Sequence, residues 1–179
     1  MISYNQYRIR AIEEGDLDFI TALRTSDFVQ SNVGSVLFPN KTSQLEWLKN
    51  VSRSQSELFL VFELEEHGSF ERIGMVRCTS IDRTNQSMCV GGDIREDMAG
   101  KSHGQGMYHL IFKLGFLTWN MNRLWLLVLE TNTRAKKLYT KMGFSEEGCQ
   151  RNAIFKNGIY TNYTMMSILK DEYKNTAKN

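Results

Sequence analysis

Apolar residues near the start of the chain recur every three or four positions, which is the period of an amphipathic helix. Leu17, Ile20 and Leu23 follow a run of acidic residues, and acidic side chains stabilise the first turn of a helix. A second helical pattern runs from about residue 43 to residue 51. The polar stretch 27–42 between them contains the only proline of the chain, so we predict a loop there.

The pattern then changes to short apolar runs that are typical of strands. Leu58–Phe62 is continuously apolar, and two further β-like segments cover residues 73–81 and 86–94. The connecting segments 65–71 and 82–85 are short and polar. Three strands that pair as antiparallel hairpins are therefore predicted.

The second half of the chain alternates between helix and strand patterns. One apolar helix face follows Gly100, then comes a strand with almost no polar residue, and then a short helix that ends before Gly143. The dipeptide Asn157-Gly158 is a strong hairpin signal between the last two strands. The apolar face of the first helix consists of Met107, Leu110, Ile111, Leu114 and Leu117. The elements after it are the strand Leu124–Leu129, the helix Asn132–Met142, and the strands Phe144–Phe155 and Tyr160–Leu169.

The order of these elements predicts the fold class. One strand is followed by two helices, three strands, a helix, a strand, a helix and two strands, which is an α/β (α+β) pattern. We expect a single domain over residues 1–170, with a mixed sheet of about seven strands flanked by about four helices. The strand-helix-strand crossover favours a parallel pair in the middle of the sheet. Residues 171–179 are predicted to form a polar C-terminal tail that frays.

Composition narrows the class of protein. The chain has 179 residues, of which 41% are hydrophobic and 23% charged, as in an ordinary globular protein. Its 22 basic and 20 acidic residues give a net charge of +2, which provides no long-range field for nucleic acid. The apolar runs are shorter than the roughly 18 residues of a membrane span, and Met1 to Arg10 do not resemble a secretory signal. We therefore expect a cytoplasmic protein without nucleic-acid or membrane partners.

The three cysteines show no spacing that indicates chemistry. Cys78, Cys89 and Cys149 lie among strand-like residues and form no C-x-x-C pair. We interpret them as small buried hydrophobic residues, and no metal site is predicted.

The segment between the strand ending at Ile94 and the next helix is the first candidate site. It contains Gly100, Gly104 and Gly106, and glycines let the backbone approach a ligand at the N-terminus of a helix, where a phosphate is favoured. Lys101 and His103 would add side-chain donors. The segment is not a P-loop, and by spacing alone a simple tight connection remains an alternative.

The helix Asn132–Met142 carries a family resemblance. The run Asn132-x-x-Ala135-x-x-Leu138-Tyr139-x-x-x-Gly143-Phe144 resembles the second signature of the GNAT superfamily of acyl-coenzyme A dependent N-acyltransferases. The glycine segment stands about thirty residues upstream, where that family keeps its coenzyme A pyrophosphate loop. The C-terminal part, through Asn157-Gly158, is similar to the branch with ribosomal-protein N-terminal acetyltransferases and nucleotide-amino-sugar N-acetyltransferases.

The resemblance implies a site for acetyl-CoA. Two parallel central strands are expected to splay apart after Ile94 and Leu127, and a bulge at Gly91 and Gly92 would supply an N–H to the thioester. The loop departs from the family pattern at Ala99 and at Ser102, which stands where the family has a glycine. The residues expected to bind the cofactor are Ile94, Arg95, Gly100, Lys101, Ser102, His103, Gly104, Gln105, Gly106 and Asn132.

The resemblance also implies the catalytic residues. Tyr139 matches the family tyrosine that protonates the departing thiolate, and a tyrosine is protonated at neutral pH. Asp93 is the expected proton acceptor for the amine, and Glu130 is the competing base. The acceptor is expected over the first two helices and beside the final hairpin, where aromatic side chains would stack on it or only anchor the loops. These are Phe28, Phe38, Trp47, Tyr160 and Tyr163.

The activity implied is acetyl transfer from acetyl-CoA to the primary amine of a small molecule, with a nucleotide-linked amino sugar as one candidate. Transfer to the N-terminal amine of a protein is the alternative. A coenzyme A binding scaffold with weak catalysis is a second alternative, because of the departures in the loop. A homodimer that pairs through the last strand, at Met165, Met166 and Ile168, is a further expectation.

Overall fold

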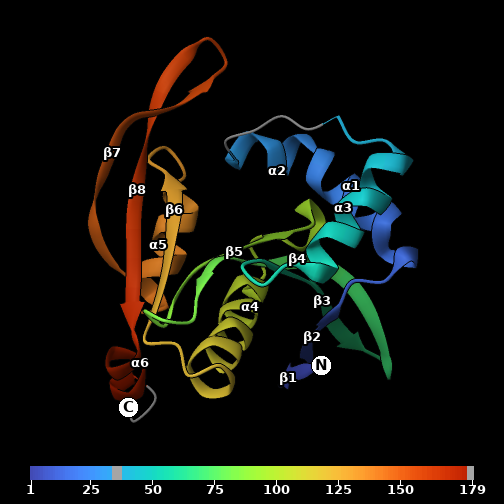
Figure 1. The fold of residues 1–179 in the computed structure, drawn as a ribbon, viewed down its shortest axis with the longest axis horizontal. Helices are drawn as coiled ribbons and strands as arrows, with labels where there is room; N and C mark the ends of the chain where they lie inside the picture. Colours follow the sequence, from blue (N-terminus) through green and yellow to red (C-terminus); the bar gives the residue numbers. More distant parts are fainter. Residues whose placement is uncertain (34–37, 177–179) are drawn as a thin grey trace.

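The computed structural model describes residues 1–33 and 38–176. In this part of the chain, eight strands form one mixed sheet (Figure 1). The strand order is β1-β2-β3-β4-β5-β6-β8-β7. The strands are β1 (Ile2–Tyr4), β2 (Tyr7–Ala11), β3 (Leu58–Glu66), β4 (Ser69–Asp82), β5 (Ser87–Ile94), β6 (Arg123–Leu129), β7 (Ser145–Lys156) and β8 (Ile159–Leu169). The helices are α1 (Leu17–Thr25), α2 (Asp27–Asn32), α3 (Lys41–Arg53), α4 (His103–Phe112), α5 (Thr133–Lys141) and α6 (Lys170–Thr176), with short turns at Glu14–Asp16 and Glu96–Met98 and a π-helix at Lys113–Thr118.

The predicted mixed architecture is confirmed. Neighbouring strands from β1 to β5 pair antiparallel, β6 and β7 both pair antiparallel with β8, and β5 and β6 are parallel. The sheet has eight strands instead of about seven because the first residues form a hairpin that turns at Asn5, whose φ is 49°. The predicted turn at Asn157 and Gly158 is present, and both residues have positive φ, as a tight hairpin turn requires.

The central parallel strands separate early. Only Ser87, Met88 and Cys89 of β5 pair with β6, opposite Arg123, Leu124 and Trp125. The family resemblance placed the separation after Ile94 and Leu127, whereas the last pair joins Cys89 to Trp125, five residues before Ile94 and two before Leu127. The register between β4 and β5 is regular through Gly91 and Gly92, so the predicted bulge at these glycines is wrong.

The two faces of the sheet bury different helices, because side chains in a strand alternate between faces. Leu60, Phe62 and Val76 belong to the core that includes α4, and Ala135 and Leu138 of α5 pack against it. Phe59 and Met75 point the other way, into a smaller core with α1, α2 and α3.

Helix α2 lies where a loop was predicted. Ser26 caps it by accepting a hydrogen bond from the main-chain N–H of Val29 at 3.3 Å, and Val29 is buried in the smaller core. A single buried residue in a helix of six residues leaves no periodic pattern in the sequence, which explains the wrong prediction. Residues 34–37 of the predicted loop lie outside the described part of the chain.

The predicted apolar face after Gly100 is correct as far as Leu114, which is 4% exposed. The π-helix Lys113–Thr118 adds residues to the turn, so the 3.6-residue period is lost. As a result Phe116 is 1% exposed, whereas Leu117, which was expected on the buried face, is 63% exposed. Gly115 permits this close packing, since a Cβ there would lie 2.8 Å from the methyl of Met88.

Three expectations about the C-terminal region and the cysteines are corrected. Residues 170–176 form helix α6 instead of a frayed tail, and the Tyr173 ring stacks on Phe116 with centroids 5.1 Å apart. Residues 177–179 of the predicted tail lie outside the described part of the chain. Met166 and Ile168 are 2% and 0% exposed, and β8 is paired on both edges, so neither these two side chains nor the edges of β8 can pair with a second copy, whereas Met165 is half-buried. Cys78 is buried as predicted, but Cys149 is exposed on β7. Among the described residues, no helix is long and apolar enough to cross a membrane.

Candidate active site

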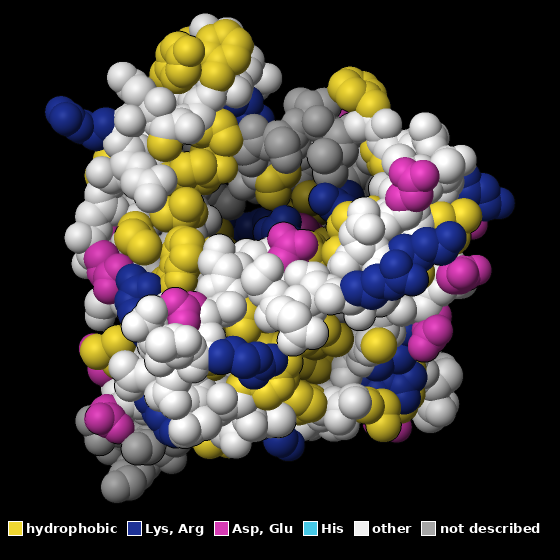
Figure 2. Space-filling view, in the orientation of Figure 1, with side chains coloured by type: hydrophobic (Ala, Val, Ile, Leu, Met, Phe, Trp, Pro, Cys, Tyr) yellow, Lys and Arg dark blue, Asp and Glu magenta, His cyan; other side chains and the backbone are white. Residues whose placement is uncertain are grey.

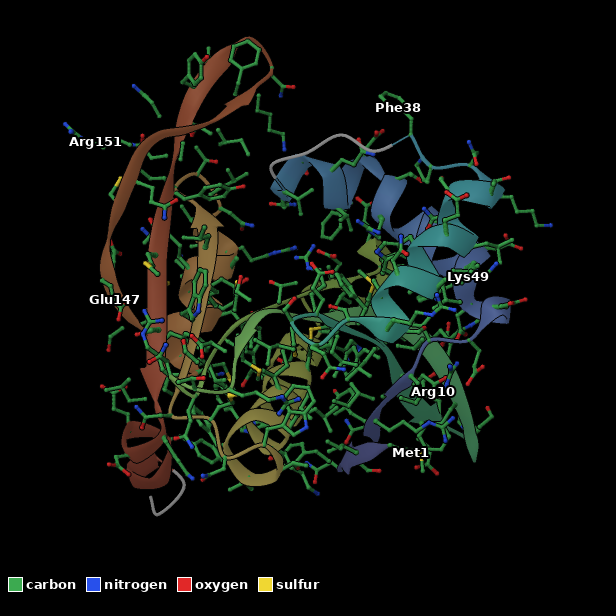
Figure 3. All side chains as sticks on the ribbon, in the orientation of Figure 1. Met1, Arg10, Phe38, Lys49, Glu147 and Arg151 are labelled. Carbon is green, nitrogen blue, oxygen red and sulfur yellow. The ribbon has the colours of Figure 1, made fainter. Side chains whose placement is uncertain are left out.

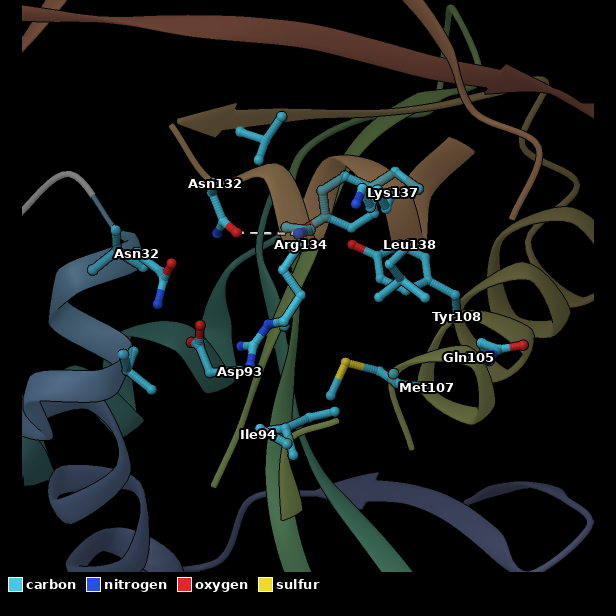
Figure 4. Close-up of a pocket in the computed structure, with 18 of the residues that line it drawn as sticks. Asn32, Asp93, Ile94, Gln105, Met107, Tyr108, Asn132, Arg134, Lys137 and Leu138 are labelled. Atoms are coloured by element: carbon cyan, nitrogen blue, oxygen red, sulfur yellow. Dashed lines mark hydrogen bonds between the residues drawn. The ribbon is translucent and has the colours of Figure 1, made fainter. Parts of the chain in front are cut away.

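A cavity of about 740 Å³ opens where β5 and β6 separate; we refer to it as the central cavity. Its walls come from the end of β5, the loop before α4, α4 and α5, together with α2 and the β7–β8 hairpin. Figure 2 shows it as a hollow between the hairpin and the helices around α2, and Figure 4 shows its lining at close range. The cavity thus joins the two segments that the sequence singled out, the glycine loop and the helix that carries Tyr139.

The loop before α4 forms one end of the central cavity. Gly100, Gly104 and Gln105, three of the residues expected to bind the cofactor, line it, and Gly100 has a φ of 81°. Ser102 also lines it and is the N-cap of α4 in the left-handed conformation, with a φ of 66°. The first N–H groups of α4 are therefore available to a phosphate at this end, with the positive end of the helix dipole behind them.

Four predicted cofactor residues are placed differently. Arg95 is paired with Asp97 and Glu71, with its Nε 2.9 Å from Asp97 Oδ1. His103 Nδ1 shares a hydrogen bond of 2.9 Å with the Tyr7 hydroxyl. A Cβ at Gly106 would lie 2.3 Å from the Tyr7 ring, so this glycine allows α4 to approach β2. The side chains of Arg95 and His103 therefore have structural partners, and neither they, Gly106 nor exposed Lys101 line the central cavity.

Ser102→Gly is expected to stabilise the protein by about 1 kcal/mol, because a left-handed conformation costs a serine roughly that amount relative to glycine. The greater freedom of glycine in the unfolded chain offsets part of this gain. Urea unfolding of both proteins measures the difference, and a titration with coenzyme A is expected to show equal or tighter binding. A clear loss of stability would contradict the strain at Ser102.

Helix α5 forms the opposite wall. Asn132 caps it, accepting a hydrogen bond from the N–H of Ala135 at 3.1 Å (Figure 4), and its side chain lies in the central cavity. Arg134, Lys137 and Lys141 also line the cavity, since residues spaced by three and seven lie on one helix face. Leu138, which lies between the two lysines in the sequence, packs against the glycine loop, since its side chain would be 2.8 Å from a Cβ at Gly104. This wall suits a polyphosphate.

Tyr139 lies in the central cavity and is packed on both sides. Its ring centroid is 5.3 Å from that of Tyr108 and 5.9 Å from that of Phe144. Burial raises the pKa of the Tyr139 hydroxyl above its usual value of 10. This phenol therefore keeps its proton throughout the neutral range and can donate it.

Tyr108 is a cavity residue that the sequence analysis missed. It lies on α4 and is 3% exposed, and its hydroxyl has no hydrogen-bond partner among the described residues. A buried hydroxyl without a partner is costly, so a ligand that supplies one would be favoured. The sequence showed only a tyrosine within an apolar helix face, which gives no signal of this kind.

Asp93 lies at the end of β5 beside a second residue that the sequence analysis missed. Asp93 is 9% exposed, and Arg77 of β4 places Nη1 3.2 Å from its Oδ2, which accepts no hydrogen bond from any described residue. Both residues line the central cavity. Glu130, the competing base, lies outside the lining and accepts a hydrogen bond of 2.8 Å from Asn162.

The remaining wall is formed by α2 and the β7–β8 hairpin. Lys156 of β7 donates hydrogen bonds to the carbonyls of Gln30 and Val33, and so joins the hairpin to the end of α2. The Arg134 guanidinium lies 4.8 Å from the centre of the Phe28 ring and joins α5 to α2. The enclosed side of the cavity is thus built from elements of both ends of the chain.

The predicted aromatic residues divide into two groups. Phe28 and Tyr163 line the central cavity. Phe38 and Tyr160 are 93% and 65% exposed, and Trp47 packs edge-on against Phe59. Among the described residues there is no cluster of three or more His, Cys, Asp or Glu side chains that suits a metal ion.

This arrangement defines an acyl-CoA-dependent acyltransferase. It combines a separated parallel strand pair, main-chain donors at a helix N-terminus, a cationic helix face and a phenol between them. The chain belongs to the acetyltransferase (GNAT) family, whose domain model matches residues 9–165. It is therefore an N-acetyltransferase that uses acetyl-CoA as the acetyl donor, and the unpartnered Tyr108 hydroxyl and the lysines of α5 fit that donor.

Among known proteins, the chain is similar to spermidine N(1)-acetyltransferase of Vibrio cholerae, with 26% identity over 97% of this chain and 99% of that protein. The solved structure of that organism's spermidine N-acetyltransferase in complex with CoA and spermine has a TM-score of 0.89, at 26% identity, over 96% of this chain and 99% of that one. Another solved structure from V. cholerae, described as dodecameric, has a TM-score of 0.81 at 28% identity, over 97% of this chain and 99% of that one. A putative ribosomal N-acetyltransferase of Bacillus subtilis matches over 56% of this chain and 55% of that protein, with 24% identity.

These comparisons confirm the superfamily and the fold. They do not single out the branch with ribosomal-protein and amino-sugar enzymes that the C-terminal resemblance indicated, because the matches over nearly the whole chain include spermidine N-acetyltransferases, whereas the putative ribosomal N-acetyltransferase matches over 56% of it.

Proposed function

We propose that this enzyme transfers the acetyl group of acetyl-CoA directly to the primary amine of a small molecule, with Tyr139 as the general acid. The observation that carries the proposal is the position of Tyr139, a half-buried phenol in the central cavity beside the point where β5 and β6 separate. The enclosure of the cavity by α2 and the β7–β8 hairpin favours a small acceptor over the end of a protein chain.

Acetyl-CoA supplies an activated thioester to the reaction. The pyrophosphate is held by the main-chain N–H groups between Gly100 and Gly104, and Lys137 and Lys141 of α5 line the same cavity. The main chain of β5 near Ile94, unpaired on the side of β6, offers hydrogen bonds to the pantetheine arm. Asn132 provides a side-chain contact from the first turn of α5.

The chemistry requires two proton movements. As the amine nitrogen forms its bond to the acetyl carbon and the C–S bond breaks, the nitrogen loses a proton and the sulfur gains one. Asp93 receives the amine's proton, directly or through water, and Tyr139 gives its proton to the thiolate. A phenol with a raised pKa suits the second task because it is fully protonated before each turnover.

A polyamine is the first acceptor to compare, because similar proteins are named spermidine N-acetyltransferases. Those relatives give no support to a nucleotide-linked amino sugar. The dodecameric relative suggests that this chain also assembles into a multimer, through surfaces other than the buried face of β8.

Thiol release tests the proposal. The purified protein is incubated with acetyl-CoA and a panel of primary amines, and free coenzyme A is followed with a thiol reagent. Amine-dependent release is expected, with one acetylated amine formed for each thiol. Tight binding of coenzyme A without turnover of any amine would instead favour the scaffold function.

A further inference from the structure

The acceptor side of the central cavity carries more positive than negative charge. The charged residues that line the cavity are Arg77, Arg134, Lys137, Lys141 and Asp93, so Asp93 is the one acid among the described lining residues. Gly34 to Leu37, which lie outside the described part, contain no charged side chain. Figure 2 shows Lys and Arg side chains inside the hollow.

The four cations divide between two ligands. Lys137 and Lys141 lie on the turns of α5 that face the glycine loop, where a polyphosphate is expected. Arg134 lies one turn earlier on α5, against Phe28 of α2, and Figure 4 shows its side chain pointing into the cavity on the side of Asp93. Arg77 rises from β4 next to Asp93. Arg77 and Arg134 therefore face the acceptor and not the cofactor phosphates.

Arg77 is not fully compensated by its partner. The contact with Asp93 is an ion pair of 3.2 Å without a hydrogen bond, so the guanidinium keeps donors for a ligand. Arg24 at the end of α1 adds a second positive charge close by, with its guanidinium 5.3 Å from the centre of the Trp47 ring. Burial lowers the pKa of Arg24, and repulsion from Arg77 lowers it further. Neighbouring like charges favour an anion between or beside them.

Resting on the proposed function, we infer that the acceptor is a primary amine that carries a carboxylate or phosphate group, which Arg77 and Arg134 recognise with support from Arg24. The amine faces Asp93 while the acidic group faces the guanidinium groups, which bind planar or tetrahedral oxyanions through two parallel hydrogen bonds. The positive surroundings also favour the neutral form of the amine, which is the nucleophile. A polyamine, with several positive charges, is disfavoured by the same groups.

The test compares acceptors that differ only in the acidic group. The pairs are 3-aminopropanoate with 3-aminopropanol, and O-phosphoethanolamine with ethanolamine, and spermidine is measured beside them. Each kcat/KM is expressed per neutral amine, at 20 and 200 mM salt. The acidic member of at least one pair is expected to be tenfold or more better than its alcohol at low salt, and the ratio is expected to fall at high salt. The pair with the larger ratio distinguishes carboxylate from phosphate.

Substitutions test whether Arg77 and Arg134 bind the acidic group of the acceptor. Arg134→Gln and Arg77→Gln are each expected to reduce the ratio to below threefold, mainly through the KM of the acidic amine, and Arg77→Lys is expected to restore part of it. Arg53→Gln, which changes an exposed arginine at the end of α3, is the matched control and should leave the ratio unchanged. Thermal unfolding and coenzyme A titration show whether each variant is folded.

Two results would overturn the inference and leave the proposed function intact. The first is that the unmodified enzyme turns over the alcohols or spermidine as well as the acidic amines or better. The second is that the ratio of kcat/KM between acidic amine and alcohol is unchanged in both glutamine variants. An absence of turnover with every amine would contradict the proposed function as well, and the two failures are thereby distinguishable.

Discussion

Tyr139→Phe is expected to reduce kcat by roughly a hundredfold or more, because the thiolate then leaves without a proton donor. The ring of Tyr139 packs against Tyr108 and Phe144, and phenylalanine keeps these contacts, so the fold is expected to persist. Acetylation and thiol release are measured at saturating acetyl-CoA. The KM for acetyl-CoA is expected to stay within a factor of about three, since the lost group acts on the transition state.

Tyr4→Phe is the matched control for this prediction, because the Tyr4 ring stacks on His109 outside the central cavity, and kcat is expected to stay within about threefold. Tyr108→Phe is measured beside it, since Tyr108 lies in the cavity with its ring centroid 5.3 Å from that of Tyr139. A larger loss for Tyr108→Phe than for Tyr139→Phe would transfer the acid role to Tyr108.

The pH profile gives a second measure of the acid role. Burial raises the pKa of Tyr139, so its protonated form persists to a higher pH than that of an exposed tyrosine. The rate per neutral amine is therefore expected to stay level up to about pH 10 and to fall only above it. A fall near pH 8 would point to a different group.

Gly74→Ala is expected to destabilise the protein by about 2–3 kcal/mol and to reduce activity. A Cβ at this position in β4 would lie 2.3 Å from the carbonyl oxygen of Asp93 and 3.3 Å from the Cα of Ile94. These are main-chain atoms of β5 and cannot rotate away, so the strands must move apart. The movement displaces Asp93 at the cavity wall. Urea unfolding and thiol release measure the two effects.

Gly15→Ala is the control for Gly74→Ala. No atom lies within 4 Å of a Cβ built there, so the free energy of unfolding is expected to change by less than about 0.5 kcal/mol. If both alanine variants have the same stability, the close approach of β4 to β5 does not constrain Gly74.

Strong periodic patterns and turn residues predicted most of the fold. The apolar run Leu124–Leu129 became β6, Asn157-Gly158 became the turn of the last hairpin, and Tyr139 reached the cavity that the family resemblance required. Each of these signals is local in the sequence. The confirmed elements are those in which a short segment by itself determines the conformation.

The remaining features depend on contacts between distant segments. Helix α2 is held by Lys156 and Arg134, which lie more than 100 residues away in the chain. Arg77 is a charged residue within a strand, and nothing in the local sequence indicates that its side chain reaches the central cavity beside Asp93. The π-helix after Phe112 alters the period that was used to predict the buried face. Such features follow from contacts between segments that are distant in the sequence, and the residue pattern of one segment does not predict these contacts.

The short ladder between β5 and β6 has a consequence for the unliganded enzyme. In the described part of the chain, three residue pairs, Ser87 to Cys89 with Arg123 to Trp125, and two hydrogen bonds to the Gln86 carbonyl join the two halves of the sheet edge to edge. A nucleotide bound between the diverging ends would contact both halves of the sheet. Its binding free energy would then stabilise the folded protein as well as the complex. At a hundred times its dissociation constant, such a ligand raises resistance to unfolding by about 2.7 kcal/mol. Saturation with acetyl-CoA is therefore expected to raise the free energy of unfolding before any amine binds.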